Sequence, residues 1–113
     1  MFDFLKRKNN VPVIDTFPIT TDIHSHILPG IDDGSPDIAT SLQLVQGIYS
    51  LGIRKTVATP HIISDLYRNT PATINAALSK LTIACKEANM DIAITAAAEY
   101  MLDDHFLHLL RET

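Results

Sequence analysis

The chain has 113 residues, of which 46% are hydrophobic and 19% charged, and its formal net charge is −4. This length and composition fit one small globular domain with a modest core. The net negative charge gives no indication of nucleic-acid binding. No stretch approaches the roughly 20 apolar residues of a membrane span. The chain start lacks the apolar core of a secretory signal, and the single cysteine, Cys85, excludes an internal disulfide. These features predict a cytoplasmic protein.

Residues 1–18 are predicted to form an N-terminal arm, and residues 19–113 a single domain. Basic residues near the start are followed by Asn9-Asn10 and by two prolines, a pattern typical of an irregular tail. A short amphipathic contact with a partner or a membrane surface is the alternative.

From Ile19 onward, strand-like and helix-like segments alternate. Strands are predicted over residues 19–26, 53–59 and 91–98. Ser35 is a fitting N-cap for a first helix that begins at Pro36 and stops at Gly52. Thr70-Pro71 repeats this start signal for a second helix that ends near Asn89, and a third helix is predicted over residues 103–111.

The resulting order, βαβαβα, is typical of parallel strands joined by right-handed crossovers. In such folds, functional sites gather at the carboxyl ends of the strands. Side chains that commonly bind metal ions lie at or just after the ends of all three predicted strands. This recurrence indicates a metal site more strongly than any single residue does.

His24 and His26 lie at the end of the first predicted strand. Residues i and i+2 of a strand point to the same side, so both imidazoles can bind one ion. Asp32 and Asp33 follow in a glycine-flanked turn; Asp33 is the predicted ligand, and Asp32 is predicted to shape the turn. Imidazole combined with carboxylate suits Zn, Mn or Fe better than Ca. A structural pair of histidines is the alternative.

His61 and Glu99 follow the second and third strands. Pro60 stops the strand ladder just before His61. Glu99 comes after three alanines, where a buried carboxylate needs a cation or a metal ion beside it. Asp22 is a candidate acceptor that orients a histidine ring.

The remaining reactive side chains receive simpler interpretations. Tyr67 and Arg68, in the loop after His61, are candidates for contact with an anionic substrate, and a solvated loop is equally compatible. Surface or packing roles are predicted for His105 and His108, and a core position for Cys85.

Three segments carry a resemblance to a known family: Asp22 to Gly34 (DIHSHILPGIDDG), Ala58 to His61 (ATPH) and Ala98 to Tyr100 (AEY). In this order they resemble the polymerase and histidinol phosphatase (PHP) superfamily. Within it, they are most similar to the bacterial manganese-dependent protein-tyrosine phosphatases of capsular and exopolysaccharide biosynthesis. The long first segment is highly specific, whereas the two short segments are weak by themselves.

The resemblance implies an α/β fold that is the N-terminal portion of a distorted (β/α)7 barrel of the PHP type. It implies up to three Mn²⁺ ions, with Fe or Zn as alternatives. His24 and His26 would bind the first ion, Asp33 and His61 another, and Glu99 would bridge a pair. The implied reaction is hydrolysis of protein phosphotyrosine by metal-activated hydroxide. The implied partner is a cognate bacterial tyrosine kinase.

Members of this family are longer, and their later strands supply further ligands and arginines that face phosphate. We therefore expect this chain to be a fragment or a natural truncation, with unpaired strand edges and weak or no activity alone. Two other functions stay open: a PHP-type phosphatase of small phosphomonoesters, and a non-catalytic module that binds a metal or a partner chain. Formation of a homo-oligomer is also left open.

Overall fold

The computed structural model describes residues 18–113, which adopt a mixed α/β fold. In chain order the elements are β1 (Thr21–Ser25), α1 (Ile38–Ser50), β2 (Lys55–Ala58), β3 (His61–Ile62), α2 (Pro71–Glu87), β4 (Ala93–Ala96), β5 (Glu99–Tyr100) and α3 (Asp104–Glu112). The predicted alternation of strands and helices is confirmed. The prediction of an arm over residues 1–18 lies outside the described residues, except for Pro18.

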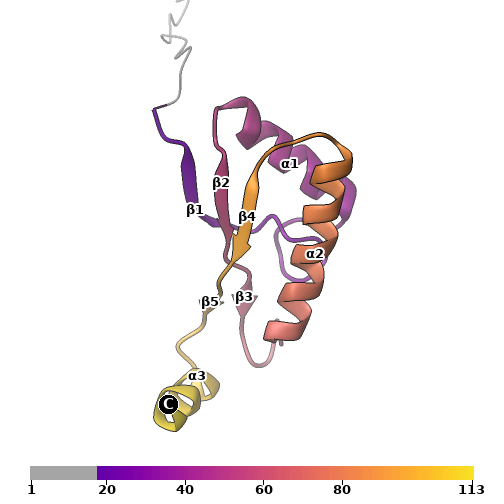
Figure 1. Cartoon of the computed structure of the whole chain (residues 1–113). Helices are drawn as coiled ribbons and strands as arrows, with labels where there is room; N and C mark the ends of the chain where they lie inside the picture. Colours follow the sequence, from indigo (N-terminus) through magenta and orange to yellow (C-terminus); the bar gives the residue numbers. More distant parts are fainter. Residues whose placement is uncertain (1–17) are drawn as a thin grey trace, which may run out of the picture.

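Two small parallel sheets organise the fold. β1, β2 and β4 form the larger sheet in that order, and every pairing in it is parallel, as predicted. β3 and β5 form the second sheet, with His61 paired to Glu99 and Ile62 to Tyr100. In Figure 1 these two short strands continue from the ends of β2 and β4. The second sheet therefore lies at the carboxyl edge of the first.

The sequence did not predict β3 and β5 as strands. Each has only two residues, which is too short for an alternation pattern to be visible. Pro60 has no amide hydrogen to donate to the ladder, so pairing is interrupted and resumes one step later. The amide of Glu99 donates to the carbonyl of Pro60 (2.9 Å), and that of Met101 to Ile62 (3.0 Å). This resumed ladder places the side chains of His61 and Glu99 next to each other.

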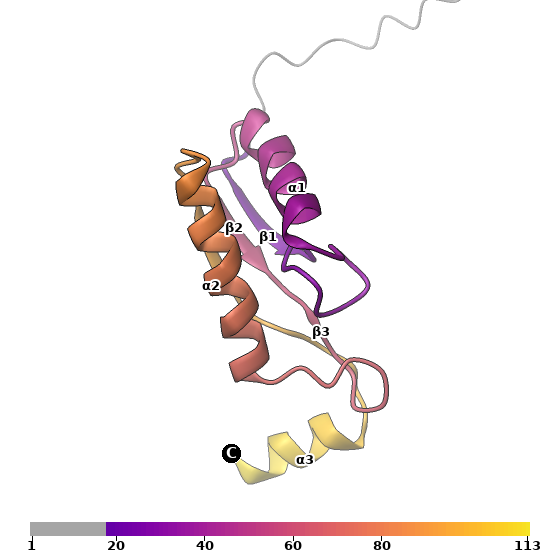
Figure 2. The ribbon, with the colours of Figure 1, turned by 90° about the vertical axis from the view of Figure 1, so that its right-hand side faces the viewer.

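α1 and α2 cover the same face of the larger sheet, as the two views in Figures 1 and 2 show. The core lies between these helices and the strands. Its buried members are Ile27, Leu28, Val45, Ala58, Ile62, Ile74, Ala77, Leu81, Cys85 and Met90. The predicted core position of Cys85 is confirmed, and burial raises the pKa of its thiol.

α1 begins two residues later than predicted. Its N-cap is Asp37, whose carboxylate accepts a hydrogen bond from the amide of Thr40 (2.7 Å). Ser35, the predicted cap, is instead fully buried, and its hydroxyl donates to the carbonyl of Asp37 (2.9 Å). Both residues have capping side chains, and the carboxylate takes the cap position here.

The other predicted helix boundaries agree closely with the structure. Thr70 caps α2 in a capping box with Thr73, and Pro71 is the first helical residue. Gly52 and Asn89, the predicted stops, both have positive φ, +96° and +54°. Within residues 18–113, no helix is both long and apolar enough to cross a membrane.

Candidate metal centre

The structure brings all five predicted ligands to one place at the carboxyl edge of the sheet. His24 lies in β1 and His26 one residue beyond it, Asp33 lies in the following turn, and His61 and Glu99 open β3 and β5. These elements meet because parallel strands end at the same edge and because β3 pairs with β5 in register.

One carboxylate oxygen of Glu99 is the centre of the cluster. Its Oε2 lies 3.1 Å from His26 Nε2, 3.3 Å from His61 Nδ1 and 3.8 Å from His24 Nε2. The prediction that Glu99 is buried is wrong, because its side chain is 43% exposed. The exposure leaves the cluster open to solvent on one side.

A second group of donors overlaps the first. His61 Nε2 lies 3.3 Å from Asp33 Oδ1, so the two nitrogens of this ring face different carboxylates. Two sets of three side chains have donor atoms within 4.8 Å of one another: His24, His26 and Glu99, and His26, Asp33 and His61. His26 is common to both sets.

The chemistry of this donor set fits a divalent transition-metal ion. Ligands at about 2.0–2.2 Å from one ion are typically about 3–3.5 Å apart, close to most of the separations within the cluster. A set of three imidazoles and two carboxylates suits Mn, Fe or Zn.

Asp32 contacts the ring nitrogen of His26 that does not face Glu99. Its Oδ2 lies 2.8 Å from His26 Nδ1 and also accepts a hydrogen bond from the amide of His61 (3.1 Å). Its Oδ1 accepts from the amide of Gly34 (3.0 Å), so Asp32 shapes the turn as predicted. The contact with His26 was not predicted from the sequence, because the two residues lie six positions apart in irregular chain.

This pairing shifts both pKa values. The hydrogen bond to Asp32 raises the pKa of His26, although burial acts in the opposite direction. Burial acts to raise the pKa of Asp32, but the hydrogen bonds from His26, Gly34 and His61 prevail and lower it. Asp32 is therefore ionised at neutral pH.

His24 is held by a different kind of group. Its Nδ1 lies 2.8 Å from the hydroxyl oxygen of Thr59. The prediction that Asp22 orients a histidine ring is wrong, because Asp22 accepts from the backbone amide of His24 (3.2 Å) and the hydroxyl of Thr56 (3.3 Å). Thr59 precedes Pro60, and nothing in its sequence context distinguished it from an ordinary strand residue.

Gly34 allows the turn to approach His26 closely. A Cβ at this position would lie 2.2 Å from the carbonyl oxygen of His26 and 2.5 Å from its Cβ. The amide of Ser35 donates to the same carbonyl (3.0 Å). The turn that carries Asp32 and Asp33 is thus packed directly against the backbone of a predicted ligand.

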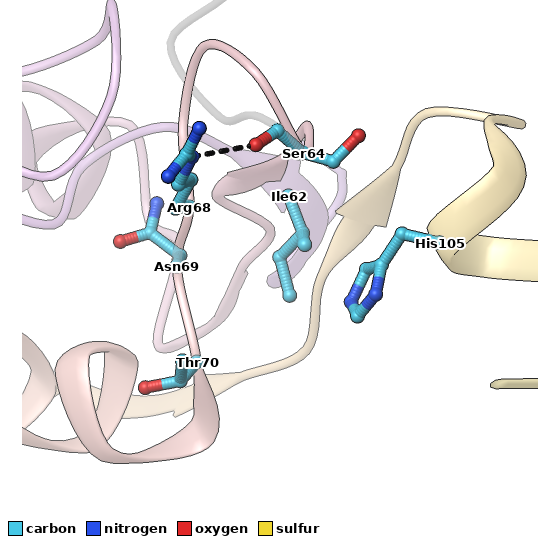
Figure 3. Close-up of a pocket in the computed structure, with 6 residues that line it drawn as sticks. All are labelled: Ile62, Ser64, Arg68, Asn69, Thr70 and His105. Atoms are coloured by element: carbon cyan, nitrogen blue, oxygen red, sulfur yellow. Dashed lines mark hydrogen bonds between the residues drawn. The ribbon is translucent and has the colours of Figure 1, made fainter. Parts of the chain in front are cut away.

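Of the two predicted substrate residues, Tyr67 contacts the cluster, whereas Arg68 lines a pocket that includes none of the five candidate ligands. The ring of Tyr67 stacks on that of His61, with centroids 5.9 Å apart and an interplanar angle of 14°. Arg68 lines a pocket of about 320 Å³, shown in Figure 3, and its Nε donates to the carbonyl of Ser64 (2.7 Å). His105, for which a surface or packing role was predicted, projects from α3 and lines the same pocket.

A hydrogen-bond network joins α3 to this pocket. Asp103, the N-cap of α3, accepts from the amide of Phe106 (2.9 Å) and from both the amide and the hydroxyl of Ser64 (3.1 and 2.7 Å). These bonds lower the pKa of Asp103 to about 2. The position of His105 therefore depends on a contact between residues 39 apart in the chain, which the sequence pattern does not reveal.

Comparison with protein families gives a match over nearly all of the described residues. The family described as "Capsular polysaccharide synthesis, CpsB/CapC" matches residues 20–113. Tyrosine-protein phosphatase YwqE of Bacillus subtilis is 43% identical over 60 residues, which are 53% of this chain and 24% of that protein. CapC of Staphylococcus aureus, also named as a tyrosine-protein phosphatase, is 27% identical over 86 residues, 76% of this chain and 34% of that protein.

A solved structure supports the same relationship. A chain from the crystal structures of YwqE from Bacillus subtilis and CpsB from Streptococcus pneumoniae, described as unique metal-dependent tyrosine phosphatases, superposes with a TM-score of 0.73 at 30% identity. The match covers 81% of this chain and 37% of that chain. The predicted fold class is thereby confirmed for the part compared, and this chain spans well under half the length of these relatives.

Proposed function

Because this chain belongs to the CpsB/CapC family of capsular polysaccharide synthesis proteins, we propose that it supplies part of the metal centre of a protein-tyrosine phosphatase. The observation that carries the proposal is the convergence of three imidazoles on one oxygen of Glu99, within 3.1–3.8 Å. Asp33 extends this cluster through its contact with His61. The relatives named as tyrosine phosphatases and the metal dependence stated for YwqE and CpsB support the reaction class.

The donor groups suggest how the ligands are shared. In the proposed site, His24, His26 and Glu99 hold one divalent ion, and Asp33 and His61 hold another with Glu99 close to both. We propose Mn²⁺ as the ion, with Fe or Zn as alternatives of compatible chemistry. Such ions supply positive charge for phosphate oxygens and lower the pKa of water towards neutrality.

The chain's own residues can also contact the substrate. Tyr67 presents an aromatic face next to His61, where it can pack against a phenyl ring. Arg68 provides a permanent positive charge at the pocket that it lines with Ser64 and His105, suited to a phosphate or carboxylate group. We propose a phosphotyrosine protein as the substrate, a cognate tyrosine kinase as the partner, and the cytoplasm as the location.

The proposal is tested by metal-dependent hydrolysis of a phosphotyrosine peptide, with small sugar phosphates as the comparison. We expect slow turnover that requires Mn²⁺, stops with a chelator and favours the peptide. Preference for sugar phosphates would favour the small-molecule phosphatase. Metal uptake without any turnover would favour the non-catalytic module, and turnover that is insensitive to the chelator would contradict a metal centre.

Replacing Cys85 with alanine is expected to leave the metal-dependent rate unchanged. Cys85 is 2% exposed in the core, and burial raises its pKa, so it cannot serve as an accessible thiolate nucleophile. Alanine is preferable to serine because it adds no buried hydroxyl. The check is a rate measurement at matched metal content, with a thiol-alkylating reagent as a second arm. A Cys85→Ala protein that is folded and metal-loaded but inactive would overturn the metal-centred reaction.

A further inference from the structure

Asp32 has a position that differs from those of the other acidic residues at the cluster. Its side chain is 1% exposed, whereas the side chains of Glu99 and Asp33 are 43% and 62% exposed. We infer that Asp32 is a positioning residue that keeps the ring proton of His26 on Nδ1, so that Nε2 faces the cluster with a free lone pair. The importance of this role rests on the proposed function, whereas the contact between Asp32 and His26 does not depend on it.

The hydrogen bonds of Asp32 determine the direction of the contact with His26. Backbone amides can only donate, so Asp32 is the acceptor from both Gly34 (Oδ1, 3.0 Å) and His61 (Oδ2, 3.1 Å). An ionised carboxylate has no proton to donate to the ring. The 2.8 Å contact between Oδ2 and Nδ1 of His26 therefore requires the proton on Nδ1.

In the neutral ring, the other nitrogen is then left as an acceptor. His26 Nε2 lies 3.1 Å from Glu99 Oε2, in the centre of the cluster. An unprotonated ring nitrogen and an ionised carboxylate oxygen cannot form a hydrogen bond with each other, so this nitrogen and this oxygen are both lone-pair donors that face the same space. A cation between them satisfies both, and Asp32 sets up this arrangement from the buried side.

Asp32 is not itself placed as a ligand. Both of its oxygens are occupied by the three hydrogen bonds described, and it belongs to neither set of converging donors. Asp33, its neighbour, is the exposed residue whose Oδ1 faces His61 Nε2 at 3.3 Å. The two adjacent aspartates thus have separate roles, one positioning and one facing the cluster.

His24 provides an internal comparison. Its Nδ1 contacts the hydroxyl of Thr59 at 2.8 Å, and a hydroxyl can donate or accept. The geometry therefore fixes the tautomer of His26 but not that of His24. His26, which contributes to both donor groups, is the ring held by the stronger, charged partner.

The experiment uses the full chain and Asp32→Asn, which keeps the size of the side chain but replaces one acceptor oxygen with a donor amide. Long-range ¹H–¹⁵N spectra of the metal-free protein, recorded at alkaline pH where imidazoles are neutral, report which nitrogen of His26 carries the proton. We expect the Nδ1–H tautomer in the parent and a shift towards Nε2–H in Asp32→Asn. Calorimetric titration with Mn²⁺ should show an affinity lowered about 10- to 100-fold.

Asp37→Asn is the matched control. Asp37 also accepts a backbone amide hydrogen bond, from Thr40 at 2.7 Å, but it caps α1 and has no contact with the cluster residues. We expect parental tautomers and parental Mn²⁺ affinity in this variant. A uniform loss of affinity in both variants would indicate general destabilisation and would count against a specific role for Asp32.

Two results would overturn the inference: an Nε2–H tautomer of His26 in the metal-free parent, or a folded Asp32→Asn protein with the parental tautomer and affinity. If Asp32→Asn does not fold, the spectrum of the parent still shows which nitrogen of His26 carries the proton. A parent with the Nδ1–H tautomer that takes up no divalent ion would contradict the proposed function while supporting the positioning of His26. The two failures are therefore distinguishable.

Discussion

Replacing His26 with alanine is expected to lower the affinity of the chain for Mn²⁺ by on the order of 100-fold or more. His26 is common to both groups of converging donors, so its loss removes an imidazole from each. It also leaves the buried carboxylate of Asp32 without its side-chain partner. His24→Ala should have a smaller effect, because His24 belongs to one group and its side chain is 58% exposed. Calorimetric titration measures both variants.

His108→Ala is the control for this comparison. His108 lies in α3, is exposed and belongs to neither donor group. We expect it to bind Mn²⁺ like the parent. Equal affinities of His26→Ala and His108→Ala would show that the imidazoles at the carboxyl edge of the sheet do not hold the ion.

Replacing Gly34 with alanine is expected to destabilise the fold and disturb the cluster together. The added Cβ would lie 2.2 Å from the carbonyl oxygen and 2.5 Å from the Cβ of His26. The backbone of the turn or of His26 must therefore move. Forcing extra volume into a packed site costs about 1–3 kcal/mol of unfolding free energy. Because the displaced residue is His26, the affinity for Mn²⁺ should fall in the same variant. Chemical denaturation and titration give the two quantities.

Gly47→Ala is the matched control for that substitution. Gly47 lies inside α1, and apart from its chain neighbours and the backbone of its own helix no atom lies within 4 Å of the position of an added Cβ. Alanine there should stabilise the protein by about 0.5–1 kcal/mol, because glycine is unfavourable within a helix. A Gly34→Ala protein with parental stability and metal affinity would refute the close packing of the turn against His26.

Much of the fold was predictable because periodicity and capping signals agree along most of the chain. Thr70, Pro71 and the apolar stripe that includes Leu81 defined α2 almost to its ends. The start of α1 was predicted wrongly because Ser35 and Asp37 are both good N-caps two residues apart, and sequence alone does not rank them. β3 and β5 were missed because their pairing depends on the tertiary register of Pro60 with Glu99.

The candidate ligands could be predicted because parallel strands bring their carboxyl ends together, whatever the details of the loops. The groups that hold the ligands could not, because they come from side-chain contacts that leave no periodic pattern. Asp32 contacts a residue six positions away through an irregular turn, and Thr59 contacts His24 across 35 residues. Asp22 was favoured for that role by its closeness in sequence, but its carboxylate bonds to backbone and to Thr56 instead.

The most direct test of the proposed metal centre is a crystal structure of the chain grown with Mn²⁺, with anomalous scattering recorded to locate the ion. We predict an anomalous peak within coordination distance of Glu99 Oε2 and His26 Nε2, the pair now 3.1 Å apart. Absence of a peak at this carboxyl edge, with the imidazoles of His24, His26 and His61 directed away from one another, would contradict the metal centre.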